Sequence, residues 1–122
     1  MQPKHHRLLW QHNEKLILRL KETCNSHYDW IIIITFYAAL HKMAILIHFK
    51  KPDFDKQFNY INHQIFNNLV HKYYNDIFAE YNNLYKISRK LRYFQTNINV
   101  ITDEKLENYL NIWFDKIKPY KI

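Results

Sequence analysis

Tyr37 and His41 are the first pair of residues whose types and spacing are suited to chemistry. If residues 30–49 form a helix, side chains four residues apart lie on one face, so the tyrosine and the histidine are neighbours. A histidine donates or accepts a proton near neutral pH, and a tyrosine hydroxyl can orient it or a bound phosphate. The alternative is a histidine that is hydrogen-bonded inside a bundle of helices.

A second set of chemically capable residues lies between Tyr85 and Tyr93. Arg89 and Arg92 are three residues apart and adjacent on a helix, with Ser88 beside them. Guanidinium groups offer forked donors for phosphate, and tyrosine rings offer a flat face to a base. The cluster has the make-up of a nucleotide or RNA contact site, and a solvated basic helix end has the same composition.

Helical periodicity predicts the elements that must position these residues. Apolar residues recur at spacings of three and four, Pro52 ends one segment, and Asp29 and Thr102 are placed to cap helices. The four isoleucines at 31–34 favour a strand by propensity, but the apolar residues that follow them favour a buried helix. The predicted helices cover residues 4–24, 30–49, 61–73, 75–94 and 103–117, and residues 50–60 form the main irregular loop.

The composition favours an all-α fold. The 122 residues are 48% hydrophobic and include three prolines and no glycine. Without glycine, tight hairpin turns, glycine-rich phosphate loops and nucleotide-binding fingerprints are disfavoured, whereas a helical bundle needs none of them. We therefore expect residues 1–122 to form a single all-α domain, a bundle of about five helices.

The basic charge is unevenly placed along the chain. The net charge is +7, and residues 1–28 and 55–99 each carry three more basic than acidic side chains. Such a field favours phosphate-bearing partners, and it also arises simply to keep a protein in solution.

The cysteine and histidine content disfavours disulfides and metal sites. Cys24 is the single cysteine, which fits a reducing compartment. His63 and His71 are eight residues apart and no other histidines have ligand spacing, so we expect neither a metal nor a cofactor. The amino terminus is polar and basic, and the apolar stretch 30–47 is shorter than a membrane span, so we expect a cytoplasmic protein without membrane contact.

Taken in order, these segments form one pattern over nearly the whole chain. Its members are Asn13, Asp29 and Trp30, residues 36–41 (FYAALH), His63, Tyr81, Leu84, Ser88 and Arg89, and Arg92 and Tyr93. The pattern resembles a group of small bacterial HEPN-like proteins. The resemblance implies a compact bundle of about five helices that commonly forms a two-fold dimer. Many HEPN domains are metal-independent endoribonucleases of defence or toxin systems.

The chain departs from the nuclease motif of that family. HEPN ribonucleases carry an arginine, usually followed by a polar residue, with a histidine a few residues further on, late in the bundle. No histidine follows Arg89 or Arg92. Only Arg7 and His12 have the spacing, with Leu8 where a polar residue is expected, so the motif is not transferred to them.

The resemblance implies a shared pocket between the second and fourth predicted helices. We expect His41 to act as acid or base and Arg89 and Arg92 to hold and neutralise a phosphate, without a metal. The remaining pocket residues, expected to bind substrate, are Tyr37, His63, Ser88 and Tyr93. The expected function is RNA or nucleotide engagement by a homodimer, with RNA cleavage in a defence or toxin–antitoxin system as one form of it.

The alternative is a non-catalytic interaction domain that partners an effector enzyme encoded nearby, which the missing late histidine favours. A third interpretation is purely structural, with His41 and Arg89 as members of a buried polar network.

Overall fold

The computed structural model describes residues 3–23, 27–53, 63–93 and 101–121. These residues form helices and no strand, which confirms the predicted all-α bundle. The helices are α1 (Pro3–Thr23), α2 (Tyr28–Lys50), α4 (His63–Tyr73), α5 (Asn75–Tyr93), α6 (Asp103–Asn111) and the π-helix η3 (Ile112–Ile117). Cys24 and most of the predicted loop at 50–60 lie outside the described residues.

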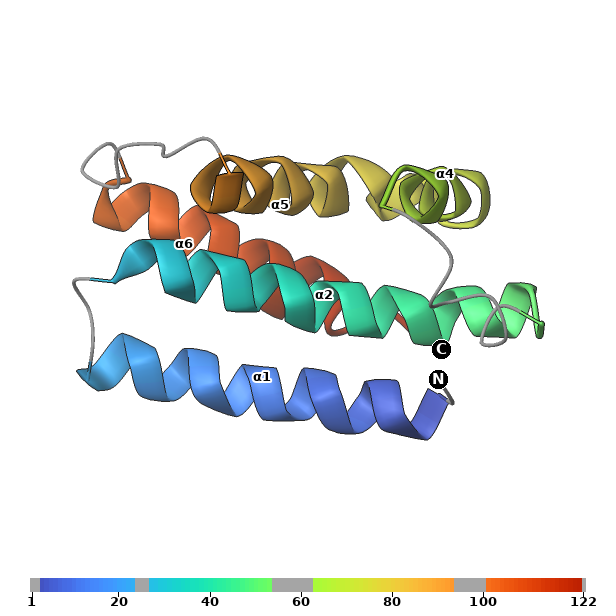
Figure 1. Ribbon diagram of the computed structural model, residues 1–122, viewed down its shortest axis with the longest axis horizontal. Helices are drawn as coiled ribbons and strands as arrows, with labels where there is room; N and C mark the ends of the chain where they lie inside the picture. The colour runs from blue at the N-terminus through green and yellow to red at the C-terminus, as the bar shows by residue number, and fades with distance from the viewer. Residues whose placement is uncertain (1–2, 24–26, 54–62, 94–100, 122) are drawn as a thin grey trace.

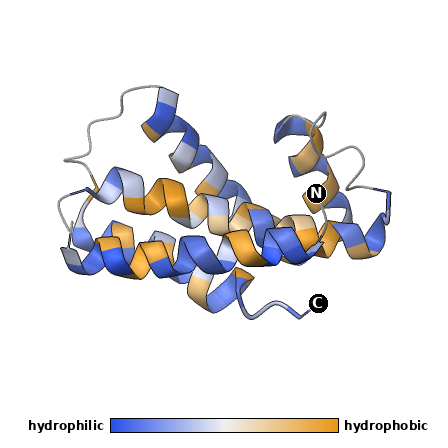
Figure 2. Ribbon diagram, turned by 60° about the horizontal axis from the view of Figure 1, so that its bottom comes forward, coloured by the Kyte–Doolittle hydropathy of each residue, from blue (hydrophilic) through white to orange (hydrophobic). Residues whose placement is uncertain are grey.

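Helix α2 lies at the centre of the bundle. Figure 1 shows α1 running alongside α2, with α5 and α6 on the opposite side of it. Every other helix in the described ranges contacts α2. Because α2 is enclosed it needs no polar face, and the residues from Ile31 to Ile47 are nearly all buried. The helices around it carry both hydrophobic and hydrophilic residues (Figure 2).

Helix α2 begins one residue before the predicted cap. The N–H of Ile31 donates to the carbonyl oxygen of His27 at 3.2 Å, so His27 is the cap residue. The prediction that Asp29 caps this helix is therefore wrong. Asp29 lies in the first turn instead, where a carboxylate favourably meets the positive end of the helix dipole. At the other end, the N–H of Lys51 donates to the carbonyl of Ile47, directly before Pro52.

The length and composition of α2 satisfy the requirement for a membrane span. The expectation that this apolar segment is too short for one is therefore wrong. In its most apolar window, 78% of the residues are buried inside the bundle. A fully enclosed core helix has the same composition, so this property alone does not distinguish the two environments.

Helices α4 and α5 follow one another across a single residue. Tyr74 separates them, and its hydroxyl donates to the carbonyl oxygen of Leu46 in α2 at 2.6 Å. The sequence predicts a buried seam of α5 at spacings of three and four, formed by Ile77, Tyr81, Leu84, Ser88 and Leu91. The first four are buried and Leu91 is half-buried. Because this face of α5 packs against the bundle, the opposite face, which includes Arg89, is exposed to solvent.

The predicted cap at Thr102 is confirmed. Its side-chain oxygen accepts a hydrogen bond from the N–H of Lys105 at 3.2 Å. Asp103 and Glu104 lie in the first turn of α6, where their charges are favourable.

The end of the chain departs from the predicted continuous α-helix. After Asn111 the helix widens, and the N–H of Lys118 donates to the carbonyl of Trp113, five residues earlier, at 2.8 Å. Trp113 is fully buried, and its ring packs edge-on against Trp10 of α1 with centroids 5.5 Å apart. The π-turn thus accommodates a large side chain at the contact with α1.

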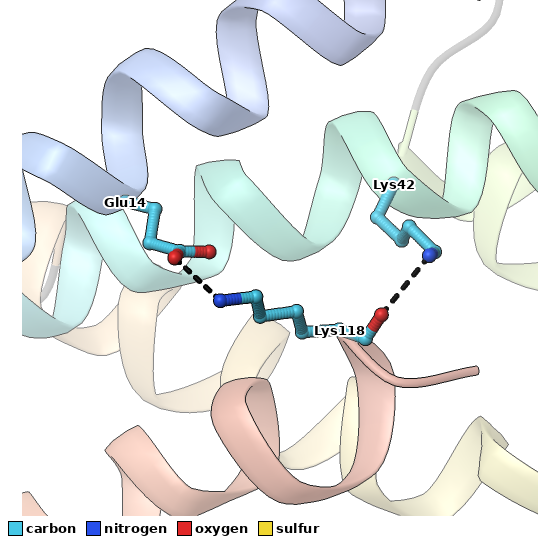
Figure 3. Close-up of polar contacts among 3 residues, drawn as sticks. All are labelled: Glu14, Lys42 and Lys118. Atoms are coloured by element: carbon cyan, nitrogen blue, oxygen red, sulfur yellow. Dashed lines mark hydrogen bonds and ion pairs between the residues drawn. The ribbon is translucent and has the colours of Figure 1, made fainter.

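Lys118 joins the end of the chain to both α1 and α2. Its Nζ lies 2.6 Å from Oε1 of Glu14, and its carbonyl oxygen accepts a hydrogen bond from Nζ of Lys42 at 3.0 Å (Figure 3). Lys42 is almost completely buried, and burial, followed by the charge of Arg7, lowers its pKa. These contacts join α1, α2 and the end of the chain, which are far apart in the sequence.

Candidate functional site

A cavity of about 430 Å³ opens between α4 and α5. Helix α4 places its first two residues on one wall, and the last three turns of α5 form the other. Its lining residues are His63, Gln64, Tyr85, Arg89, Arg92 and Tyr93. Four of these, His63, Arg89, Arg92 and Tyr93, are among the residues that the sequence assigned to a site.

Arg92 is held in place by contacts to two helices. Its Nη1 donates to the hydroxyl of Tyr37 in α2 at 2.6 Å, and its Nε donates to the carbonyl oxygen of Ser88 at 3.3 Å. The guanidinium carbon also lies 5.6, 5.4 and 5.1 Å from the ring centres of Phe36, Tyr37 and Tyr93. A guanidinium has five N–H donors, so these two bonds fix its orientation and leave donors for a ligand.

Arg89 lies one turn before Arg92 on the same wall. It is exposed, and its Nη1 donates to the hydroxyl of Tyr85 at 3.1 Å. Residues three apart on a helix are neighbours, so both guanidinium groups can reach a single anion.

His63 faces these arginines from α4. Its ring centre lies 5.4 Å from that of Tyr85 and 6.0 Å from that of Phe36. Burial, and then the positive charges of Arg92 and Arg89, lower the pKa of His63. The imidazole is therefore neutral at pH 7 and can act as a hydrogen-bond donor and acceptor.

His41 occupies a different environment from these residues. Its Nδ1 lies 2.8 Å from Nδ1 of His6 in α1, so one imidazole donates to the other. His6 is buried, and burial lowers the pKa of both histidines, that of His6 to about 4. His41 is absent from the described residues that line the α4–α5 cavity. The structure therefore brings Arg89 and Arg92 together but does not add His41 to them.

Tyr37 and Ser88 contribute to the site without lining the cavity. The hydroxyl of Tyr37 contacts Arg92, and the carbonyl of Ser88 accepts from the same side chain. The side chain of Ser88 is fully buried, and its Oγ has no hydrogen-bond partner among the described residues. Both residues therefore contact Arg92. This role differs from the substrate contact that we expected for them from the sequence.

Sequence reasoning missed His6 and Gln64. His6 lies four and eleven residues before Trp10 and Ile17, which puts it on the buried face of α1, and this register was visible in the sequence. No sequence signal distinguished Gln64 from other polar residues. Its place in the cavity depends on where α4 starts relative to α5.

The ionisable side chains of the cavity favour an anion. Arg89 and Arg92 carry permanent positive charge, and no carboxylate is among the described residues that line it. Within the described ranges, no group of three or more His, Cys, Asp or Glu side chains is placed to hold a metal ion. A metal-free site stays a prediction.

A comparison with family models, with curated proteins and with solved structures gave no match to this chain. The resemblance to HEPN domains therefore stays a prediction, and the functional argument depends on the geometry of the cavity.

Proposed function

We propose that this chain binds RNA or a nucleotide in the cavity between α4 and α5. The observation that carries the proposal is the pairing of two adjacent guanidinium groups, Arg89 and Arg92, with aromatic rings in one cavity. No carboxylate is among the lining residues that the structure describes. Forked guanidinium donors match the oxygens of a phosphate group.

The tyrosines of the cavity supply the second half of a nucleotide contact. Tyr93 is 67% exposed, and its ring adjoins the guanidinium of Arg92. Tyr85 forms part of the same wall. A base can stack on an accessible tyrosine ring while its phosphate is bound by the neighbouring arginines.

Cleavage of RNA receives less support than binding. Attack by a ribose hydroxyl needs groups that remove one proton and supply another. His63 is the imidazole of the described cavity wall, and His41 contacts His6 instead. The proposal is therefore one of binding, with His63 as the candidate proton-transfer group should cleavage be detected.

The test is the affinity of a fluorescent single-stranded RNA for the purified chain. Arg89→Ala and Arg92→Ala should each weaken binding by about tenfold, because each removes a charged contact to phosphate. Arg19→Ala removes the same charge from an exposed position on α1 and should change the affinity little. Equal effects of all three changes would show non-specific charge attraction and contradict the proposal.

One feature favours the second candidate, a non-catalytic interaction domain. A mainly apolar hollow on α1 and α2 is lined by Leu16, Leu20, His27, Trp30 and Ile34. Trp30 is 57% exposed, and exposed apolar patches commonly mark protein contacts. The occupant of this hollow can be a second copy of the chain, as the expected homodimer requires. In that case Trp30→Ser should convert the dimer to a monomer, and light scattering measures the change in mass.

A further inference from the structure

The cations of the α4–α5 cavity carry more charge than one internal phosphate of RNA. Arg89 and Arg92 contribute two permanent positive charges to one wall. A phosphodiester carries one negative charge, whereas a phosphate monoester approaches two at neutral pH. The charge of the cavity thus matches a monoester.

The arrangement of donors points in the same direction. Arg92 is fixed by Tyr37 and by the carbonyl of Ser88, so its remaining N–H groups have a defined direction. Arg89 adjoins it on α5, and His63 approaches from α4. A monoester offers three terminal oxygens to these three side chains, whereas a diester offers only two.

The volume of the cavity suits one terminal nucleotide. About 430 Å³ is in the range of pockets that bind a single small ligand. The accessible ring of Tyr93 lies beside Arg92, so a base next to the phosphate has a surface on which to stack.

His63 can add a hydrogen-bond donor, and its protonation depends on the charge of the bound ligand. The groups that contact it or shift its charge are Tyr85, Arg89 and Arg92 of α5 and Phe36 of α2, with Gln64 next to it on α4. In the free protein, burial and then the charges of Arg92 and Arg89 disfavour the imidazolium and lower the pKa of His63. A dianion next to the two guanidinium groups offsets their repulsion and favours the protonated imidazole, which can donate to it.

We propose that this cavity recognises the terminal phosphate monoester of an RNA strand or mononucleotide in preference to internal phosphodiesters. This inference rests on the proposed RNA-binding function and specifies which part of the ligand is recognised. Arg89 and Arg92 hold the phosphate, His63 completes its contacts, and Tyr93 stacks on the adjoining base.

The test compares three synthetic oligoadenylates of one length: one with a 5′-phosphate, one with a 3′-phosphate and one with hydroxyls at both ends. At least one phosphorylated strand should bind about tenfold more tightly than the hydroxyl-ended strand. The two phosphorylated strands identify the end that is recognised. Competition by inorganic phosphate and by adenosine monophosphate separates recognition of the phosphate alone from recognition of a nucleotide.

The variants separate this inference from the proposed function. Arg92→Ala should remove the preference for the phosphorylated strand, and Arg19→Ala should keep it. Circular dichroism checks the helical fold, and the exposed Arg89 provides a second variant, Arg89→Ala, if Arg92→Ala does not fold. The monoester inference would be overturned if the wild type bound all three strands equally and Arg89→Ala bound none of them. The proposed RNA binding would then still stand. No binding of any strand would overturn both.

Discussion

The hydroxyl of Tyr37 accepts a hydrogen bond from Nη1 of Arg92 at 2.6 Å, and this bond joins the buried helix α2 to the wall of the α4–α5 cavity. The ring of Tyr37 also lies 5.4 Å from the guanidinium carbon. Tyr37 is thus a positioning residue: it orients the arginine that we place against phosphate.

Tyr37→Phe should weaken RNA binding by roughly threefold to tenfold, because the ring remains while the oxygen that orients Arg92 is lost. The dependence of the dissociation constant on salt should stay as in the wild type, since the charge is kept, whereas Arg92→Ala should reduce that slope by about one. Tyr109→Phe, in α6, is the matched control. Wild-type affinity in Tyr37→Phe would contradict the positioning role.

The affinity for hydroxyl-ended RNA should rise as the pH falls from about 8 to 6. Burial and the charges of Arg92 and Arg89 lower the pKa of His63 in the free protein, and a bound phosphate raises it again. The complex therefore takes up a proton, which strengthens binding at lower pH. His63→Asn should flatten this dependence, and His12→Asn, an exposed position on α1, should preserve it. A pH profile that is unchanged in His63→Asn would assign the dependence to another group.

The fold should lose stability in acid because His6 and His41 lie side by side, the first buried and the second half-buried. Burial lowers both pKa values, that of His6 from 6.5 to about 4, so the unfolded chain binds more protons than the folded chain between these values. This contribution is fully present above pH 6.5 and is lost as the pH falls toward 4. Urea unfolding at several pH values measures it.

His6→Asn should make that stability profile flatter. At neutral pH it should lower the free energy of unfolding by about 1 kcal/mol, the usual effect of a lost hydrogen bond. The exposed His12→Asn variant should retain the wild-type profile. An equally steep acid loss in His6→Asn would show that other groups cause it.

Two buried tyrosines should respond in opposite directions to loss of their hydroxyls. Tyr81 is fully buried, and its hydroxyl has no hydrogen-bond partner among the described residues, whereas the hydroxyl of Tyr74 donates to Leu46. Tyr81→Phe should raise the free energy of unfolding by about 1 kcal/mol, and Tyr74→Phe should lower it by about the same amount. Thermal unfolding of both variants provides the comparison. A destabilised Tyr81→Phe variant would show that this hydroxyl is bonded in solution.

Much of the fold could be predicted because its signals are local. The cap at Thr102, the helix end before Pro52 and the buried seam of α5 each depend on residues within a few turns. The π-turn could not be predicted, because it accompanies the packing of Trp113 against Trp10, about a hundred residues away.

The sequence predicted the part of the site whose residues lie on a single helix, α5. The spacing of Arg89 and Arg92 alone makes them neighbours. Tyr37 and His41 share a face by the same rule, but four residues of α-helix also rotate a side chain by about 40° and advance it by about 6 Å. That difference is enough for Tyr37 to contact α5 and for His41 to contact α1. Contacts between helices, unlike spacing within one, require the tertiary arrangement.

During synthesis on the ribosome, α2 emerges before α4, α5 and α6, which enclose it in the finished bundle. At that stage α1 is the one described helix already available to cover its apolar surface. Helix α1 therefore shields a segment that otherwise has the composition of a membrane span. A nascent chain without α1 would present this segment to chaperones, to membranes and to other unfinished chains.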